Sequence, residues 1–387
     1  GEGGEAGSRS VMLLWDVARP KAPRCALGAA AEVTCFAFAP HTHEVVVAGT
    51  ADGATLAWDL REVSQAGEAW RRPSYSSEWC GADVGAHGGV VGVEAIPGSD
   101  PTYKPFEFKV VTLDAGGKVD VWTAGEVTRS VAVGGGVDPG VRYGSRLTML
   151  RTVRGVAYGG SADAAGERPA RALAVLPEDP QSFLVAMDGG AILRGAHFGR
   201  APPPREYVLE APGCPGRFAA TAALEASSLR FSPFLPDTFA VAHRQGGVAV
   251  HRTGRSLLLH GWDGFSGAEV VAVRWSPCRP SVLLCLDSQS TVFAFDLLAP
   301  GGMQYPVHTE RFGGTGADGV SRVVAFEASA PASSHALVKD TEHLLVLAYD
   351  DGRVDVHLLS AKFAAGEDLE SEIEATRAHL AELAGGS

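Results

Sequence analysis

Short runs in which apolar and polar residues alternate follow one another along the chain, with polar turns between them. The clearest group spans residues 32–62. It contains an alternating run at residues 33–38, a second apolar run at 44–48, the pair Asp52-Gly53, and a third run that ends in Trp58-Asp59. Alternation with a period of two predicts β-strands with one buried face, and Asp-Gly between two such runs predicts a hairpin turn. Residues 32–62 are therefore predicted to form consecutive antiparallel strands.

The same arrangement recurs along the chain. Runs that match the third strand end near residues 15, 58, 122, 194, 251, 295 and 357. The shortest separations are 43 residues, from 15 to 58, and 44 residues, from 251 to 295, and they match the period of roughly 40–45 residues of four-stranded propeller blades. Seven such ends predict an all-β, seven-bladed WD-repeat β-propeller over residues 11–361. The longer separations predict insertions in its loops.

The first repeat is shorter than the others. Residues 1–10 are rich in Gly and Glu, which predicts a flexible segment, and they leave no room for two strands before the run that ends in Trp15-Asp16. A propeller closes when its first and last blades complete one another, because closure removes exposed strand edges. We therefore expect the first blade to be incomplete in this chain, which would be a piece of a longer polypeptide or lack a segment.

The last stretch, residues 362–387, has a different period. Acidic residues precede a pattern that places Leu369, Ile373, Leu380 and Leu383 on one face of a helix. A short amphipathic C-terminal helix is predicted. It either packs on its own domain or offers Leu369 and Ile373 to a partner.

One repeat carries the residue types that form a hydrogen-bond chain inside WD-repeat blades. His87 precedes the first run, Thr112 and Asp114 follow the second, and Trp122 ends the third. By resemblance to WD repeats we expect these side chains to be linked within the blade, which gives His87 a structural role in place of a catalytic one. The matching residues of the preceding repeat are Asp52, Trp58 and Asp59.

Composition and charge narrow the class of protein. Of the 387 residues, 45% are hydrophobic, and Gly (48) and Pro (23) are abundant, which suits many short strands and tight turns. The net charge of −12 argues against a nucleic-acid partner. No apolar run approaches the roughly 18–20 residues needed to span a bilayer. The six cysteines form no CxxC pair and are expected to be free thiols of a reducing compartment.

Motifs that carry chemistry are missing from the sequence. GxxxxGK[ST], HExxH and GxSxG do not occur, and the histidines do not pair with cysteines at metal-ligand spacing. We therefore expect no enzyme activity, no cofactor and no metal site. A propeller enzyme with a site in its central channel remains an alternative.

An insertion at residues 63–89 carries candidate binding residues. Trp70, Arg72, Tyr75 and Trp79 are aromatic and Arg side chains in an otherwise polar loop, and these are the residue types of interface hot spots. Two hypotheses stay open, that these residues bind a partner or that the two Trp pin the loop to the propeller. A second insertion, at residues 134–169, is rich in Gly and Ala and is expected to be partly flexible.

Several segments carry a resemblance to a known family. Residues 48–53 (AGTADG), the continuation Trp58-Asp59-Leu60-Arg61-Glu62, and the segments at 72–76 and 275–282 resemble the propeller of dynein intermediate chains. The C-terminal helix and Phe295-Asp296 are most similar to the intermediate chains of cytoplasmic dynein 2, the larger of the two in particular. The sequence departs from the repeat pattern where His251 and His357 replace Trp.

The resemblance implies a role. In this family the propeller binds the tail of a dynein heavy chain, and a disordered N-terminal arm binds light chains. We expect no residue of this sequence to correspond to that arm. It implies as partners the dynein-2 heavy chain, the second dynein-2 intermediate chain, the light chains and the proteins of intraflagellar transport trains. It implies a location in the cytoplasm and cilium or flagellum (axoneme and basal body), on microtubules. A generic WD-repeat adaptor, such as a ubiquitin-ligase substrate receptor, is the alternative.

Overall fold

The computed structural model describes residues 10–40, 42–62, 70–80, 88–98, 106–126, 145–156, 169–209, 225–313, 315–316, 319–329, 343–359, 363 and 368–385. Contacts divide the chain into two compact units. Unit 1 comprises Gly1–Tyr158, Ala164–Val175 and Gly195–Gly199, and unit 2 comprises Gly159–Asp163, Leu176–Arg194 and Arg200–Ser387.

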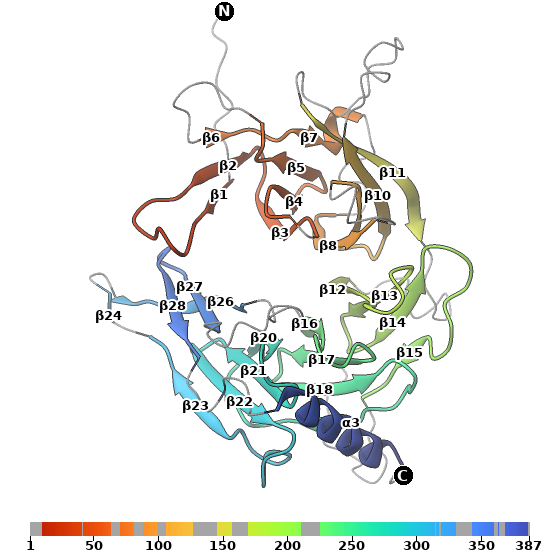
Figure 1. Ribbon diagram of the computed structural model, residues 1–387, viewed down its shortest axis with the longest axis vertical. Helices are drawn as coiled ribbons and strands as arrows, with labels where there is room; N and C mark the ends of the chain where they lie inside the picture. The colour runs from red at the N-terminus through yellow and green to blue at the C-terminus, as the bar shows by residue number, and fades with distance from the viewer. Residues whose placement is uncertain are drawn as a thin grey trace, which may run out of the picture. The chain divides into compact units, whose positions relative to one another are not determined.

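Unit 1 contains three sheets that follow the chain order closely, two of them antiparallel and the first mixed. The first, in the order β1-β2-β6, has three described strands, because β6 from the insertion pairs in parallel with β2 (Figure 1). The other two have four strands each, in the orders β3-β4-β5-β7 and β11-β10-β9-β8. The strands are β1 (Ser10–Leu14), β2 (Cys25–Ala29), β3 (Val33–Phe38), β4 (Val45–Thr50), β5 (Thr55–Asp59), β6 (Trp70–Arg71), β7 (Tyr75–Ser76), β8 (Val90–Pro97), β9 (Phe108–Asp114), β10 (Val119–Glu126) and β11 (Leu147–Val156), and the 3-10 helix η1 (Ser77–Cys80) follows β7.

Unit 2 continues the pattern with sheets in the orders β16-β17-β18-β19, β20-β21-β22-β23 and β26-β27-β28, and with the two-stranded ribbon β24-β25. Their strands are β16 (Ala226–Phe231), β17 (Thr238–His243), β18 (Gly247–Arg252), β19 (His260–Trp262), β20 (Val270–Trp275), β21 (Val282–Asp287), β22 (Thr291–Asp296), β23 (His308–Arg311), β24 (Thr315–Gly316), β25 (Gly319–Val320), β26 (Val323–Ala328), β27 (Leu344–Tyr349) and β28 (Val354–Leu358). A further sheet has the order β12-β13-β14-β15 and consists of Ala170–Val175, Ser182–Met187, Ile192–Ala196 and Glu206–Tyr207.

Each of these sheets of three or four strands is a propeller blade, and the described residues form seven of them. The predicted all-β, seven-bladed propeller with a C-terminal helix is confirmed. The predicted flexible segment at residues 1–10 includes Ser10, with which β1 begins, and residues 1–9 lie outside the described part of the chain.

The cores lie between neighbouring blades. In unit 1, Val47 and Tyr75 of one blade pack with Phe108 and Trp122 of the next. The second strands β4, β17 and β21 are buried along their whole length, because neighbouring sheets cover both of their faces. Burying a large apolar side chain contributes about 1.5–3 kcal/mol, so these inter-blade contacts hold the blades in place.

Hairpin turns connect the strands at the positions that the sequence predicts. Asp114 Oδ1 accepts a hydrogen bond from the Lys118 amide at 2.7 Å, and Gly117 takes a φ of 82° between β9 and β10. Asp287 Oδ1 likewise accepts from the Thr291 amide at 2.8 Å between β21 and β22. Asp satisfies the turn amides of both hairpins, and the residue at positive φ is Gly117 in the first and Ser290 in the second, so these turn residues set the register of the hairpins.

The C-terminal helix α3 (Leu369–Gly385) packs on unit 2. Leu380 is 2% exposed and joins the core of the blades β16–β19 and β20–β23. Glu372 Oε1 accepts from Arg279 Nε at 3.0 Å and from Ser281 Oγ at 2.8 Å. The helix is therefore part of the core of unit 2.

Candidate protein-interaction site

The blade β8–β11 brings two of the predicted network residues together. Trp122 Nε1 donates a hydrogen bond to Thr112 Oγ1 at 3.0 Å, and both side chains are buried. Trp122 pairs with Val110 across the strands, so Thr112 lies two residues further along the neighbouring strand. Asp114 lies at the turn that ends β9. His87 lies outside the described residues.

The preceding blade lacks the matching hydrogen bond. Trp58 pairs with Val46, and the residue two positions further is Ala48, which has no hydroxyl. Trp58 is 1% exposed, and its Nε1 has no hydrogen-bond partner. Since an unsatisfied buried donor costs about 1–3 kcal/mol, this tryptophan contributes packing alone.

Asp52 organises the hairpin between β4 and β5. Its Oδ1 accepts from Thr50 Oγ1 and from the Ala54 amide. Burial raises the pKa of Glu78, and the charge of Asp52 and a hydrogen bond to it raise that pKa further. The carboxyl of Asp52 therefore links the hairpin to η1.

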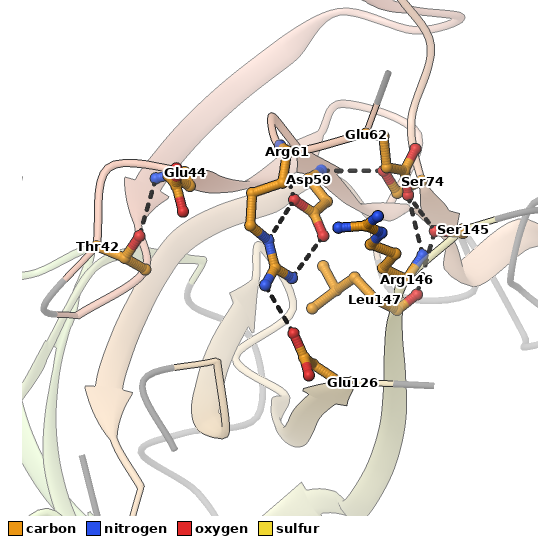
Figure 2. A network of polar contacts seen from close by, with 10 residues as sticks. All are labelled: Thr42, Glu44, Asp59, Arg61, Glu62, Ser74, Glu126, Ser145, Arg146 and Leu147. Atoms are coloured by element: carbon orange, nitrogen blue, oxygen red, sulfur yellow. Dashed lines mark hydrogen bonds and ion pairs between the residues drawn. The ribbon is translucent and has the colours of Figure 1, made fainter. Parts of the chain in front are cut away.

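Asp59 anchors a contact between two blades of unit 1, shown in Figure 2. Its carboxylate accepts hydrogen bonds from Arg61 Nε at 2.9 Å and from Arg61 Nη2 at 2.7 Å. Arg61 Nη1 donates a third hydrogen bond to Glu126 Oε1 at 2.6 Å. The guanidinium also lies over the ring of Phe106, 3.4 Å from its centroid. A bidentate, partly buried pair of this kind has stronger hydrogen bonds than an exposed ion pair, so it holds β5 against β10.

A second contact joins the same blades through Glu62. Its Oε1 accepts from Ser145 Oγ at 2.5 Å and from the Arg146 amide at 3.2 Å (Figure 2). The backbone oxygen of Glu62 accepts from Arg71 Nη1. Glu62 thus connects the insertion that carries β6 to the start of β11. The sequence showed no signal for this contact, because its partners are more than 80 residues apart.

Trp70 lies on the insertion where it meets the first blade. It pairs with Ala26 of β2 and packs over Gly28 so closely that a side chain there would overlap the indole ring. It nevertheless remains 38% exposed, and Arg72 is exposed beside it. Trp70 therefore fixes the insertion to the blade and still presents part of its ring at the surface.

The structure corrects the prediction for Tyr75, which is buried, and it shows Ile373 only partly exposed. Tyr75 is fully buried, because β7 adds a fourth strand to its blade and turns this ring into the core, at 6.3 Å from the Trp122 ring. Ile373 packs against the core of unit 2, because α3 turns this face inward. Leu369 is 39% exposed on the same helix. The backbone of Trp79 lies in η1, and its side chain is outside the described part of the structure.

A pair of buried histidines was not identified from the sequence as a site. Burial lowers the pKa of His243 to about 4 and that of His251 to about 3, with the charge of His243 lowering the latter further. His251 stacks on Phe239 at 5.2 Å between ring centroids. Within the described ranges, no three His, Cys, Asp or Glu side chains are placed to hold a metal, and no described helix could cross a membrane.

The seven blades, one of which carries an internal Trp–Thr hydrogen bond, define the class of the protein as a WD-repeat β-propeller. The crystal structure of Saccharomyces cerevisiae Sqt1 shares this fold, with a TM-score of 0.53, 12% identity, and coverage of 87% of this chain and 74% of that one. Within this class, the chain is similar to the intermediate chains of cytoplasmic dynein 2.

Two curated proteins carry this similarity. The chain is 26% identical over 322 residues to cytoplasmic dynein 2 intermediate chain 1 of Mus musculus, and 25% identical over 320 residues to the Homo sapiens protein of that name. Each match covers 75% of this chain but 31% and 29% of the respective relatives, so the chain spans less than a third of their length. No protein-family model matches the chain.

Proposed function

We propose that the chain is a non-catalytic subunit of a dynein-2 motor, and that its propeller binds the tail of the dynein-2 heavy chain. The observation that carries this proposal is the similarity to dynein-2 intermediate chain 1 over three quarters of the chain. A rigid propeller suits the role, because inter-blade cores and the Arg61 and Glu62 contacts keep surface side chains in fixed positions. Pre-organised side chains lose less entropy on binding.

The surface around Trp70 and Arg72 is the candidate contact for the heavy chain. Both side chains are exposed on an insertion that β2 and Glu62 hold in place. Trp and Arg are the residue types that most often dominate binding energy. The wider proposal is that the protein acts in retrograde intraflagellar transport with the second intermediate chain and light chains, in the cytoplasm and cilium.

A pull-down with the heavy-chain tail tests the contact. Trp70→Ala combined with Arg72→Ala should weaken binding by roughly 30-fold or more, since a hot spot is worth about 2 kcal/mol. Tyr305→Ala with Arg322→Ala is the matched control, because both side chains are exposed on unit 2. Binding of the first variant at wild-type strength, with normal thermal unfolding, would place the interface elsewhere.

Affinity purification of the full-length protein from ciliated cells, followed by mass spectrometry, tests the complex as a whole. Recovery of a dynein-2 heavy chain is the expected result. Recovery of ubiquitin-ligase subunits without any dynein subunit would instead identify a generic WD-repeat adaptor and reject the proposal.

A further inference from the structure

One sheet face in unit 1 is covered at β4 and β5 but not at β3. On this face Phe36 of β3 pairs with Ala48, and Phe38 pairs with Val46. Ala48 is 0% and Val46 2% exposed, because β1 and β2 of the first sheet pack over them. The two phenylalanines are 60% and 39% exposed. The first sheet therefore leaves the inner strand of the next blade uncovered.

The equivalent face in unit 2 is covered by two strands. The strand β20 has the same register as β3, including a shift after its first residue pair, so Val273 and Trp275 match Phe36 and Phe38. Val273 is 0% and Trp275 5% exposed. The first two strands of the preceding blade, β16 and β17, contact β20. Trp275 Nε1 also donates a hydrogen bond to the backbone oxygen of Arg230 on β16 at 3.1 Å.

The first sheet of unit 1 has no counterpart of β16 and β17 among the described residues. Its strand β1 runs into Trp15-Asp16, the ending that the third strand β5 has in Trp58-Asp59, and β2 follows it. In the part of the chain that the structure describes, β1 is an edge strand. Ser10 Oγ accepts a hydrogen bond from the Val33 amide at 3.3 Å, so this strand begins beside β3. We name the edge of β1 together with the two exposed phenylalanines the strand-acceptor site.

We propose that the strand-acceptor site binds a β-hairpin, whose second strand pairs with β1 and which lies over Phe36 and Phe38. This is the arrangement of β16 and β17, because β17 pairs with the third strand of its blade, β18. An edge strand presents backbone N–H and C=O groups that an added strand can pair with. The face that meets the two rings is apolar at every second residue of the hairpin, as in other half-buried strands.

The hairpin belongs to the same polypeptide and lies outside the 387 residues of this sequence. The complete blades β16–β19 and β20–β23 are each built from four consecutive strands of one chain. The described strands of unit 1 all belong to its sheets already. The match to the mouse relative covers 31% of that protein, and a polypeptide of such length holds many further segments. This site is independent of heavy-chain binding.

Photo-crosslinking in the full-length protein identifies what fills the site. The photoreactive residue p-benzoylphenylalanine replaces Phe36 in one variant and Leu150 in the matched control, which is 66% exposed on β11 of the same unit. The first variant should form crosslinks within its own polypeptide, to a segment outside residues 1–387, at a yield that dilution does not change. A crosslink from position 36 to another protein, or no crosslink at all, overturns the proposal.

Amide hydrogen exchange in the same protein tests the pairing of β1. Its amides should exchange at least about tenfold more slowly than those of β23, which is also an edge strand and is exposed throughout. Phe36→Glu should remove this protection, because a carboxylate is too costly to bury under the hairpin, whereas Leu150→Glu should keep it. Thermal unfolding checks that both variants are folded. Exchange of β1 as fast as that of β23, or protection that survives Phe36→Glu, overturns the proposal.

Discussion

Trp122 and Trp58 occupy the same position in neighbouring blades, but their indole nitrogens differ in what they contact. Trp122 donates to Thr112, whereas Trp58 faces Ala48 and has no partner. Single residues thus decide whether a blade carries its internal hydrogen bond, although both tryptophans are almost fully buried.

Thr112→Val should destabilise the protein by about 1–2 kcal/mol. The substitution keeps the shape of the side chain but leaves Trp122 Nε1 as an unsatisfied buried donor. Chemical denaturation followed by tryptophan fluorescence measures the change. An unchanged midpoint would show that the hydrogen bond contributes no net stability.

Ala48→Ser should have the opposite effect and stabilise the protein by about 1 kcal/mol. The added hydroxyl lies two residues beyond the partner of Trp58, where Thr112 lies in the next blade, and supplies an acceptor for Trp58 Nε1. Ala48→Gly adds no acceptor and serves as the control. Lower stability of the Ser variant would mean that the core cannot take up the hydroxyl.

The buried histidines should make stability depend on pH. The pKa values of about 4 for His243 and about 3 for His251 lie below the value of roughly 6.5 in an unfolded chain. Between these values the unfolded state binds more protons, so stability falls as pH decreases from about 6.5 towards 4, by up to roughly 1.4 kcal/mol per pH unit for each histidine.

His251→Phe should flatten this dependence while it keeps the stack on Phe239. Urea unfolding at pH values from 4.5 to 7.5 measures the slope. His308→Phe, at an exposed position, is the control and should leave the slope as it is. An unaltered slope in the His251 variant would assign the acid sensitivity to other groups.

At the scale of elements, the packing of α3 distinguishes two hypotheses for this helix, that it packs on its own domain or that it binds a partner. Its apolar face meets the core of two blades through Leu380 and Ile373, and Glu372 binds Arg279. Leu369 alone of the four predicted apolar positions is exposed.

Leu380→Ala should therefore lower the free energy of unfolding by about 2–5 kcal/mol, as for other large-to-small changes in cores. Leu369→Ala on the same helix should change it by less than about 1 kcal/mol, because this side chain is 39% exposed. Thermal and urea unfolding compare the two variants. Similar small effects of both would indicate that α3 is only loosely attached to unit 2.

At the scale of the whole molecule, the burial of a sheet face in each unit depends on whether a neighbouring sheet covers that face. The second strand β21 is buried at every position, whereas β27 of the last sheet alternates between buried and partly exposed residues. On β28, Val354, Val356 and Leu358 are exposed on one face. Similar apolar strand sequences thus end inside a core or at the surface according to their neighbours.

The sequence by itself determined the strands, the hairpins and the class of the protein. Alternation and Asp-Gly turns act over a few residues, so they predict β4 and β5 and their register without knowledge of the rest of the chain. The same holds for the helical period of α3, whereas the Trp122–Thr112 pair, ten residues apart, was expected from the resemblance to WD repeats.

The tertiary structure alone decided which side chains reach the surface. Tyr75 and Ile373 are residue types common in binding sites, but neighbouring strands bury Tyr75 and the packing of α3 partly buries Ile373. The Glu62–Ser145 and Arg279–Glu372 contacts join residues 83 and 93 positions apart. No local period encodes such pairs, because they depend on how separate blades, insertions and the helix pack together.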